Sequence, residues 1–314
     1  MLQIKKILFP TDYSACAEQA FSQAAYLAER YDAAVHVLHV TEPSAVLKPL
    51  GLTEADVAAD LHLPTPESAQ AEAPSSDEEA LLHVEVPPVE GSVERAILDY
   101  AAQQDCDLIV MGTHGRRALD RLFLGSVAGK VVRLAECPVF TVGVEARSPA
   151  QGAVQRILVP IDFSEHARLA LAYASDLAAT YGAHLDLLHV VEETALPIIY
   201  GIEPVLVQVS EVQHQARQAL ERLVREVGVA DGSYNVHVTV GHPASDIVGF
   251  AERQGIDLVV IATHGLTGIK RLLLGSVAER VVHRAPCPVF TVKGFGKRLL
   301  TPVAATEVVE QPVP

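Results

Sequence analysis

This chain of 314 residues contains nearly the same sequence twice, with position 7 matching position 157 and later positions keeping that offset. Residues 7–14 (ILFPTDYS) match 157–164 (ILVPIDFS), and 137–142 (CPVFTV) is identical to 287–292. Such a repeat is too long for a solenoid and has the size of one domain. The chain is therefore predicted to fold as two similar domains. We place the first domain at 1–143, a linker at 144–153, the second domain at 154–294 and a disordered tail at 295–314.

Each half alternates short apolar runs with helical patterns. We expect strands near 4–9, 34–40, 82–86, 107–112 and 138–142, and again near 155–160, 183–190, 234–240, 257–262 and 287–293. We expect helices near 14–30, 92–104, 126–135, 164–181, 208–227, 244–254 and 276–285. Continuous Ile, Leu and Val runs are typical of parallel strands covered on both faces. With right-handed crossovers, the pattern predicts an α/β fold of two tandem doubly wound domains. Each would be a five-stranded, mostly parallel, flavodoxin- or Rossmann-like sheet flanked by helices.

The two halves differ between their second and third strands. The second half has an amphipathic helix over 208–227, whereas the first offers only a short helical candidate over 53–61. An acidic, proline-containing insert follows at about 54–79, and we expect residues 64–79 to be loosely packed. Two interpretations remain open for this insert: a variable surface loop, or a lid or partner-docking segment.

Charge and composition exclude several classes of function. A net charge of −15 argues against nucleic acid or an anionic membrane as the main partner. No apolar run approaches the roughly 18 residues that a membrane span needs. The four cysteines have no metal-binding or paired spacing and indicate reduced thiols, so we expect a cytoplasmic protein. Signatures of P-loops, dinucleotide-binding loops, serine-hydrolase elbows and zinc proteases are absent.

A glycine-containing loop follows the fourth predicted strand of each half and leads into a helix. The first loop reads Gly-Thr-His-Gly over 112–115 and ends in Gly-Ser at 125–126. The second reads Ala-Thr-His-Gly over 262–265 and ends in Gly-Ser at 275–276. Such a turn presents backbone N–H groups to an anion, and the helix dipole assists. Basic residues nearby, including Arg121 and Arg271, suit a phosphate ligand, although a solvated helix face is the alternative for each.

Two other matched pairs lie where a ligand could bind. Asp12 and Asp162 follow the first strand of each half, either as turn residues that accept local N–H groups or as carboxylates that face a ligand. His39 and His189 end the second strands and are expected to be structural. His114, inside the first glycine loop, is a better candidate for ligand contact. No cluster has metal-ligand spacing, so any Mg²⁺ is expected to arrive with nucleotide phosphates.

These motifs together resemble the universal stress protein family over nearly the whole chain. The resemblance implies an adenine nucleotide alpha hydrolase-like fold, with adenine held by the first aspartate and by the backbone of the valine that ends the second strand. It implies that the glycines lie by the ribose and phosphates. The candidate nucleotide-binding residues are Pro10, Asp12, Val40, Gly112, His114, Gly115, Gly125 and Ser126 in the first half, and Asp162, Val190, Ala262, Gly265, Gly275 and Ser276 in the second.

The second half departs from the family pattern at Ala262, where the first half has Gly112. A methyl group there could crowd the approach of backbone to ligand, so we expect weaker nucleotide binding at the second site. The family also implies that the last strands pair antiparallel, which would cover two apolar edges and form an intramolecular pseudo-dimer. A further homodimer is compatible with the sequence, and a protein partner cannot be named.

The leading hypothesis is an ATP-binding stress or regulatory protein, with ADP and AMP as alternative ligands. No convincing base or nucleophile accompanies the loops, so we expect no catalytic residues and at most slow ATP hydrolysis. Two alternatives remain: an enzyme of the same fold that uses adenylate chemistry, and an interaction module whose loops are structural turns only.

Overall fold

The computed structural model describes residues 2–41, 81–86, 92–113, 124–143, 154–192, 209–263 and 274–300. The first half contains β1 (Lys6–Thr11), α1 (Ala15–Tyr31), β2 (Ala34–Val40), β3 (Leu81–Val86), α3 (Val93–Gln103), β4 (Leu108–Gly112), α4 (Ser126–Leu134) and β5 (Val139–Val142). The second half contains β6 (Arg156–Pro160), α5 (Glu165–Tyr181), β7 (His184–Glu192), α6 (Val209–Val227), β8 (Tyr234–Gly241), α7 (Pro243–Gln254), β9 (Leu258–Ala262), α8 (Ser276–Arg284) and β10 (Val289–Val292).

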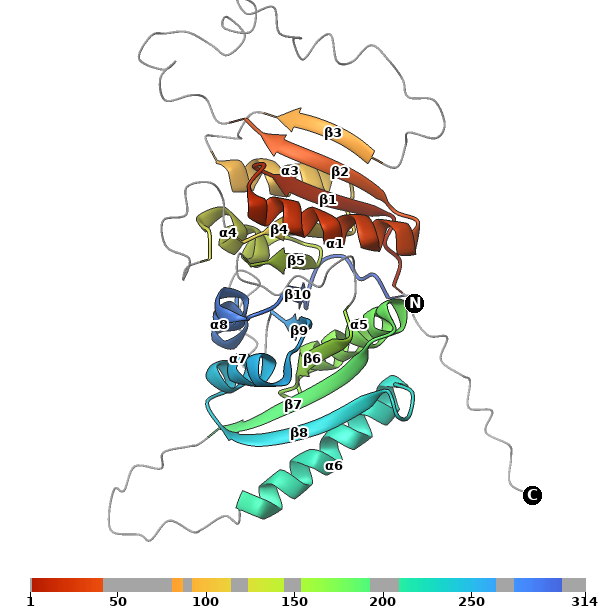
Figure 1. Cartoon of the computed structure of the whole chain (residues 1–314), viewed down its shortest axis with the longest axis vertical. Helices are drawn as coiled ribbons and strands as arrows, with labels where there is room; N and C mark the ends of the chain where they lie inside the picture. The colour runs from red at the N-terminus through yellow and green to blue at the C-terminus, as the bar shows by residue number, and fades with distance from the viewer. Residues whose placement is uncertain are drawn as a thin grey trace, which may run out of the picture.

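All ten strands of the described residues form one sheet in the order β3-β2-β1-β4-β5-β10-β9-β6-β7-β8. Within each half the strands are parallel, as the continuous apolar runs predicted. The halves join where β5 and β10 pair antiparallel, with Phe140 opposite Phe290 at the centre of the molecule (Figure 1). The hydroxyl of Thr141 donates to the carbonyl of Val289 at 3.2 Å, and Thr291 donates to Val139 at 3.0 Å. The expected pairing of the last strands is therefore present.

Helices cover both faces of this sheet in two layers that each extend across both halves. One core cluster lies beneath α1, α5 and α6, and the other lies beneath α3, α4, α7 and α8. Helices α1 and α5 also touch directly: Tyr26 stacks on Tyr181 with ring centroids 4.9 Å apart. The Tyr31 hydroxyl donates to Asp176 at 3.1 Å and lies 2.9 Å from the Thr180 hydroxyl. These contacts join the two helices across the junction of the halves, while the apolar side of each helix packs on the sheet.

The elements begin and end within two residues of the expected limits because their signals are local. Ser14 accepts a hydrogen bond from Ala17 N, and Ser164 accepts one from Ala167 N, so each caps the helix that follows it. Helix α6 forms as its apolar stripe predicted, with Leu220 and Val224 fully buried. The candidate helix over 53–61 and the acidic insert lie outside the described residues.

The disordered tail expected from residue 295 onward is wrong for residues 295–300, because residues 293–300 form an ordered strap that contacts both halves. Lys297 forms ion pairs with Asp105 at 2.8 Å and with Asp107 at 2.7 Å, and its backbone N–H donates to the Glu136 carbonyl at 2.7 Å. Leu299 is buried, and its N–H donates to the Tyr173 hydroxyl at 2.7 Å. Long-range partners, which local composition does not reveal, hold this segment. Residues 301–314 lie outside the described part of the chain.

Candidate functional site

The strand order brings the predicted site residues of each half to one edge of the sheet. In the first half β1 lies between β2 and β4, so the carboxyl ends of these three strands are neighbours. Pro10 lies near the end of β1, Val40 ends β2 and Gly112 ends β4. From β1 the chain runs to β2 and then β3 on one side, and it returns to β4 on the other side of β1. A doubly wound sheet opens a crevice for ligands at such a switch point. In the second half Pro160 ends β6 and Ala262 ends β9, while Val190 lies two residues before the end of β7 at Glu192.

Asp12 and Asp162 follow β1 and β6 and form tight turns into the next helix. Asp12 Oδ1 accepts from Ser14 N at 3.1 Å, and Asp162 Oδ1 accepts from Ser164 N at 3.0 Å and from the Ser164 hydroxyl at 2.6 Å. The turn interpretation of these residues is therefore observed. The same hydrogen bonds fix the orientation of each carboxylate at the crevice, so the turn does not compete with a role in ligand binding.

Aromatic residues next to these aspartates were missed by sequence reasoning. Tyr13 and Phe163 have φ angles of 57° and 63°, a left-handed conformation that bulky residues rarely adopt. Their side chains are 53% and 39% exposed. The Tyr13 ring lies 4.8 Å from that of His39, and the Phe163 ring lies 4.6 Å from that of His189. The sequence offers one sign of these residues: an aromatic residue stands between Asp and Ser in both halves. Only the structure shows that each aromatic adopts a backbone conformation that favours glycine.

The strand-end histidines support the first turn of each half. His39 Nδ1 lies 2.9 Å from the Thr11 carbonyl, and His189 Nδ1 lies 2.8 Å from the Ile161 carbonyl. A carbonyl oxygen only accepts, so Nδ1 carries the proton in both rings. The structural role expected for His39 and His189 is therefore confirmed. His114, Gly115 and Gly265, together with Arg121 and Arg271, lie outside the described residues.

Helices α4 and α8 begin without a side-chain cap, in contrast to α1 and α5. Gly125 and Gly275 are their N-cap residues, and neither helix has a side-chain hydrogen bond at this end. The N–H of Gly125 donates to the Thr113 carbonyl at 2.8 Å, and Gly275 makes the same bond to Thr263. This bond ties each helix start to the end of the preceding strand. The amides of the first turn and the helix dipole then suit an anion at this edge.

The first turns of these two helices differ in charge. The first turn of α8 carries Glu279, whereas the matching position of α4 is Gly129. A carboxylate at this position would repel an anion at the start of α8, and the first turn of α4 has no acidic residue. Lys130, one of the basic residues expected near the first loop, is hydrogen-bonded to Glu94 of α3. Its charge is therefore partly balanced by the protein itself.

The structure gives the difference between Gly112 and Ala262 a different physical meaning. A Cβ added at Gly112 would lie 2.9 Å from Cys16 Sγ, 3.1 Å from the carbonyl carbon of Cys16 and 3.2 Å from Ala17 N. The glycine therefore lets β4 approach the first turn of α1. In the second half, His166 stands where Cys16 does and lies against Gly294. Gly112 is therefore required by the packing of α1 against β4, while the expectation that Ala262 weakens the second site stays a prediction.

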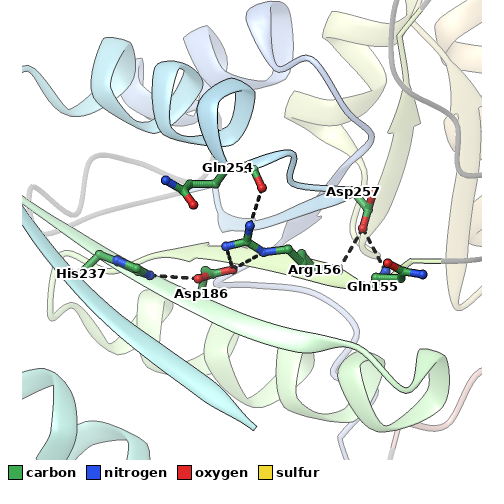
Figure 2. A network of polar contacts seen from close by, with 6 residues as sticks. All are labelled: Gln155, Arg156, Asp186, His237, Gln254 and Asp257. Carbon is green, nitrogen blue, oxygen red and sulfur yellow. Dashed lines mark hydrogen bonds and ion pairs between the residues drawn. The ribbon is translucent and has the colours of Figure 1, made fainter.

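A second polar network lies near the amino ends of the strands, away from the candidate site (Figure 2). Asp186 on β7 is fully buried, and its Oδ2 accepts from Arg156 Nε at 3.0 Å and from Arg156 Nη2 at 2.8 Å. Its Oδ1 lies 2.9 Å from His237 Nε2. In the first half His36 occupies the matching position and contacts the Tyr100 hydroxyl at 2.8 Å. Both carboxylate oxygens of Asp186 are engaged, which indicates a structural ion pair.

Within the described ranges, no group of three or more His, Cys, Asp or Glu could hold a metal ion. None of the helices that the structure describes is long and apolar enough to cross a membrane. All four cysteines are buried and free. Burial raises the pKa of the Cys106 thiol to about 11 and that of Cys137 to about 12, so neither is a reactive thiolate at neutral pH.

Fold and topology together define a tandem α/β protein in which α4 and α8 begin, without a side-chain cap, after the fourth strand of each half. The universal stress protein family model matches residues 3–143 and 153–293. A universal stress protein of Mycolicibacterium smegmatis is 30% identical over 294 residues, which cover 91% of this chain and 96% of that protein. Universal stress protein MJ0531 of Methanocaldococcus jannaschii is 34% identical over 142 residues, 44% of this chain and 82% of that one. The chain therefore belongs to the universal stress protein family.

Solved structures agree on the fold. A universal stress protein from Archaeoglobus fulgidus aligns with a TM-score of 0.59 at 21% identity, covering 93% of this chain and 97% of that one. Protein PA1789 from Pseudomonas aeruginosa aligns with a TM-score of 0.64 at 19% identity, covering 92% of each chain. At these identities the likeness concerns the arrangement of helices and strands.

Proposed function

We propose that this protein binds ATP at the carboxyl edge of each half and serves a nucleotide-dependent regulatory or stress-response role. The observation that carries the proposal is the start of α4. This helix begins at the switch point of the sheet without a side-chain cap, while α1, starting beside it, is capped by Ser14. An uncapped helix start at that place suits the phosphates, and the oriented carboxylate of Asp12 suits the adenine amino group.

Each candidate residue then has a role in the first site. Asp12 and the backbone of Val40 hold the base, with Pro10 beside them. Gly112, His114 and Gly115 lie by the ribose and phosphates. Ser126 holds the terminal phosphates through its N–H and its hydroxyl, and Gly125, whose own N–H donates to the Thr113 carbonyl, forms the turn that places them. Asp162, Val190, Ala262, Gly265, Gly275 and Ser276 are the counterparts at the second site, which we rank below the first.

Tyr13 and Phe163 extend this assignment. An exposed ring held in a costly backbone conformation beside the base-binding aspartate offers an apolar surface to adenine. The positive φ angles favour a functional role, because a glycine at either position would adopt them without the cost that an aromatic residue has.

ATP hydrolysis at this site is at most slow. Neither a nucleophile nor a second carboxylate is among the candidate residues that the described strands and helices bring to this edge, so the site supplies binding groups for a nucleotide more readily than a general base. Any Mg²⁺ would be carried by the phosphates, since the candidate residues supply few oxygen ligands of their own.

The free, buried cysteines suit a reducing compartment, and a cytoplasmic location is part of the proposal. The partner whose binding changes with nucleotide occupancy would be a second copy of the chain or another protein. The proposed role is the same for either partner.

Isothermal titration calorimetry with ATP, ADP and AMP tests the proposal. The wild-type chain is expected to bind ATP, and Asp12→Asn is expected to weaken the first site about tenfold. The substitution retains an oxygen that accepts from Ser14 N–H but replaces the other acceptor oxygen by an NH2 group and removes the charge, and loss of a charged hydrogen bond costs roughly 1.5 kcal/mol. Asp32→Asn, at the far end of α1, is the matched control and should leave binding unchanged. Absence of binding at millimolar nucleotide would exclude the proposed function.

A further inference from the structure

One hydrogen bond connects the second half directly to the anion-binding turn of the first. His283 lies in the last turn of α8, and its Nδ1 accepts from the backbone N–H of Leu124 at 3.2 Å. The two residues are 159 positions apart in the sequence. Helices α4 and α8 lie one above the other in Figure 1, on either side of the junction between the halves.

Leu124 immediately precedes Gly125, the N-cap residue of α4. The helix start is therefore held from two directions. Gly125 N–H donates to the Thr113 carbonyl within the first half, and Leu124 N–H donates to His283 of the second half. The amides of Leu124 and Gly125, fixed in this way, determine where the following amides of Ser126 and Val127 point. Their direction decides how well a phosphate is held.

The reciprocal contact cannot form at the second site. The position in α4 that matches His283 is Arg133, which is exposed. A guanidinium has donors and no acceptor, so it cannot take a hydrogen bond from the N–H of Leu274, the match of Leu124. The repeat has therefore become asymmetric at this place. The second half supports the first site, and the first half cannot support the second in the same way.

We infer that His283 is a positioning residue for the phosphate-binding turn of the first site, which is thereby completed by the other half of the chain. The inference rests on the proposed nucleotide binding and adds a determinant of the first site. It also predicts that the first half alone would bind nucleotide more weakly than the whole chain does.

The test uses the full chain in an Asp162→Asn background, which reduces binding at the second site. His283→Ala is expected to weaken ATP binding about fivefold, the effect of losing one neutral hydrogen bond. His283→Asn places an amide oxygen where Nδ1 stood and should restore most of the affinity. Arg133→Ala, measured at the second site in an Asp12→Asn background, is the matched control and should change nothing. Unchanged ATP affinity in His283→Ala would overturn the inference.

Amide hydrogen exchange at Leu124, measured without nucleotide, separates this inference from the proposed function. Exchange should be faster in His283→Ala and return towards wild type in His283→Asn. An unchanged rate would show that the hydrogen bond does not hold the turn and would overturn the inference. If the wild-type chain binds no ATP, the proposed function fails and the positioning role fails with it. Faster exchange in that case would identify His283 as a fold contact only.

Discussion

The tight packing of Gly112 against α1 predicts the effect of its smallest substitution. Gly112→Ala adds one carbon 2.9 Å from Cys16 Sγ, 3.1 Å from the Cys16 carbonyl carbon and 3.2 Å from Ala17 N. Two of these neighbours are backbone atoms at the start of a capped helix. The thiol cannot turn away without cost, because it donates to the Val142 carbonyl at 3.1 Å. Helix α1 must therefore move outward by a few tenths of an ångström.

Overpacking of this kind costs about 1–3 kcal/mol of unfolding free energy. Each kcal/mol lowers the melting temperature by roughly 2–4 °C in a chain of this order of size. Urea denaturation and thermal unfolding of Gly112→Ala measure the loss. The double variant Cys16→Ala with Gly112→Ala removes Sγ, the nearest atom, and should recover part of the stability. The rest of the loss should remain, because the two backbone contacts are still present.

Ala262→Gly is the matched control in the second half. It removes a methyl that is already accommodated there and should change stability by no more than about 1 kcal/mol, the usual cost of glycine. If Gly112→Ala left stability unchanged and instead reduced ATP affinity at the first site, the glycine would serve the ligand and not the helix. The packing explanation would then be wrong, and the expectation that Ala262→Gly strengthens the second site would regain its basis.

Three further predictions concern the site and its surroundings. Glu279→Gln should strengthen ATP binding at the second site about two- to fivefold, and Gly129→Glu should weaken binding at the first site by a similar factor. If both variants bind ATP as the wild type does, charge at this helix position does not affect the sites. Tyr13→Gly should leave stability unchanged or raise it by about 1 kcal/mol, because it relieves the left-handed conformation, and should weaken nucleotide binding; a loss of stability with intact affinity would contradict a functional ring. Burial lowers the pKa of Lys293 to about 8 in the folded chain, while the unfolded chain keeps the ordinary value near 10.5. Between these two pH values Lys293 is protonated in the unfolded chain and neutral in the folded chain. The buried charge therefore destabilises the folded state below about pH 8, and the free energy of unfolding rises by up to about 3 kcal/mol as pH increases towards 10.5. Lys293→Met should lack this pH dependence in urea denaturation, and identical slopes in both proteins would refute it.

The sequence predicted the elements well because their determinants are local. Apolar runs bounded by turns indicated the strands, and Ser14 and Ser164 marked helix starts that the structure confirms. The candidate residues Asp12, Val40, Gly112 and Gly125 are brought to one edge because the carboxyl ends of parallel strands share an edge. That conclusion needed only the alternation of strands and helices, with the handedness of the crossovers.

Contacts between distant residues could not be predicted in the same way. The left-handed backbone of Tyr13 could not be predicted from the repeated segment that contains it, because the sequence does not specify φ angles. The ordered strap depends on Lys297 reaching Asp105 and Asp107, about two hundred positions earlier in the chain. The prolines near the end of the chain, Pro302, Pro312 and Pro314, favoured a disordered tail from residue 295 onward.

The sequence by itself determined a duplicated α/β chain of the universal stress protein family, since a repeat and its motifs are properties of residue order. Only the tertiary structure decided how the two halves differ in use. Gly112 lies against Cys16 and Ala17 at the start of α1, a contact that residue order alone does not reveal. His283 gains a partner in the first half, whereas Arg133, at the matching position, has no acceptor to offer the second. The contact of His283 is possible because β5 pairs with β10, which sets residues of one half beside the other.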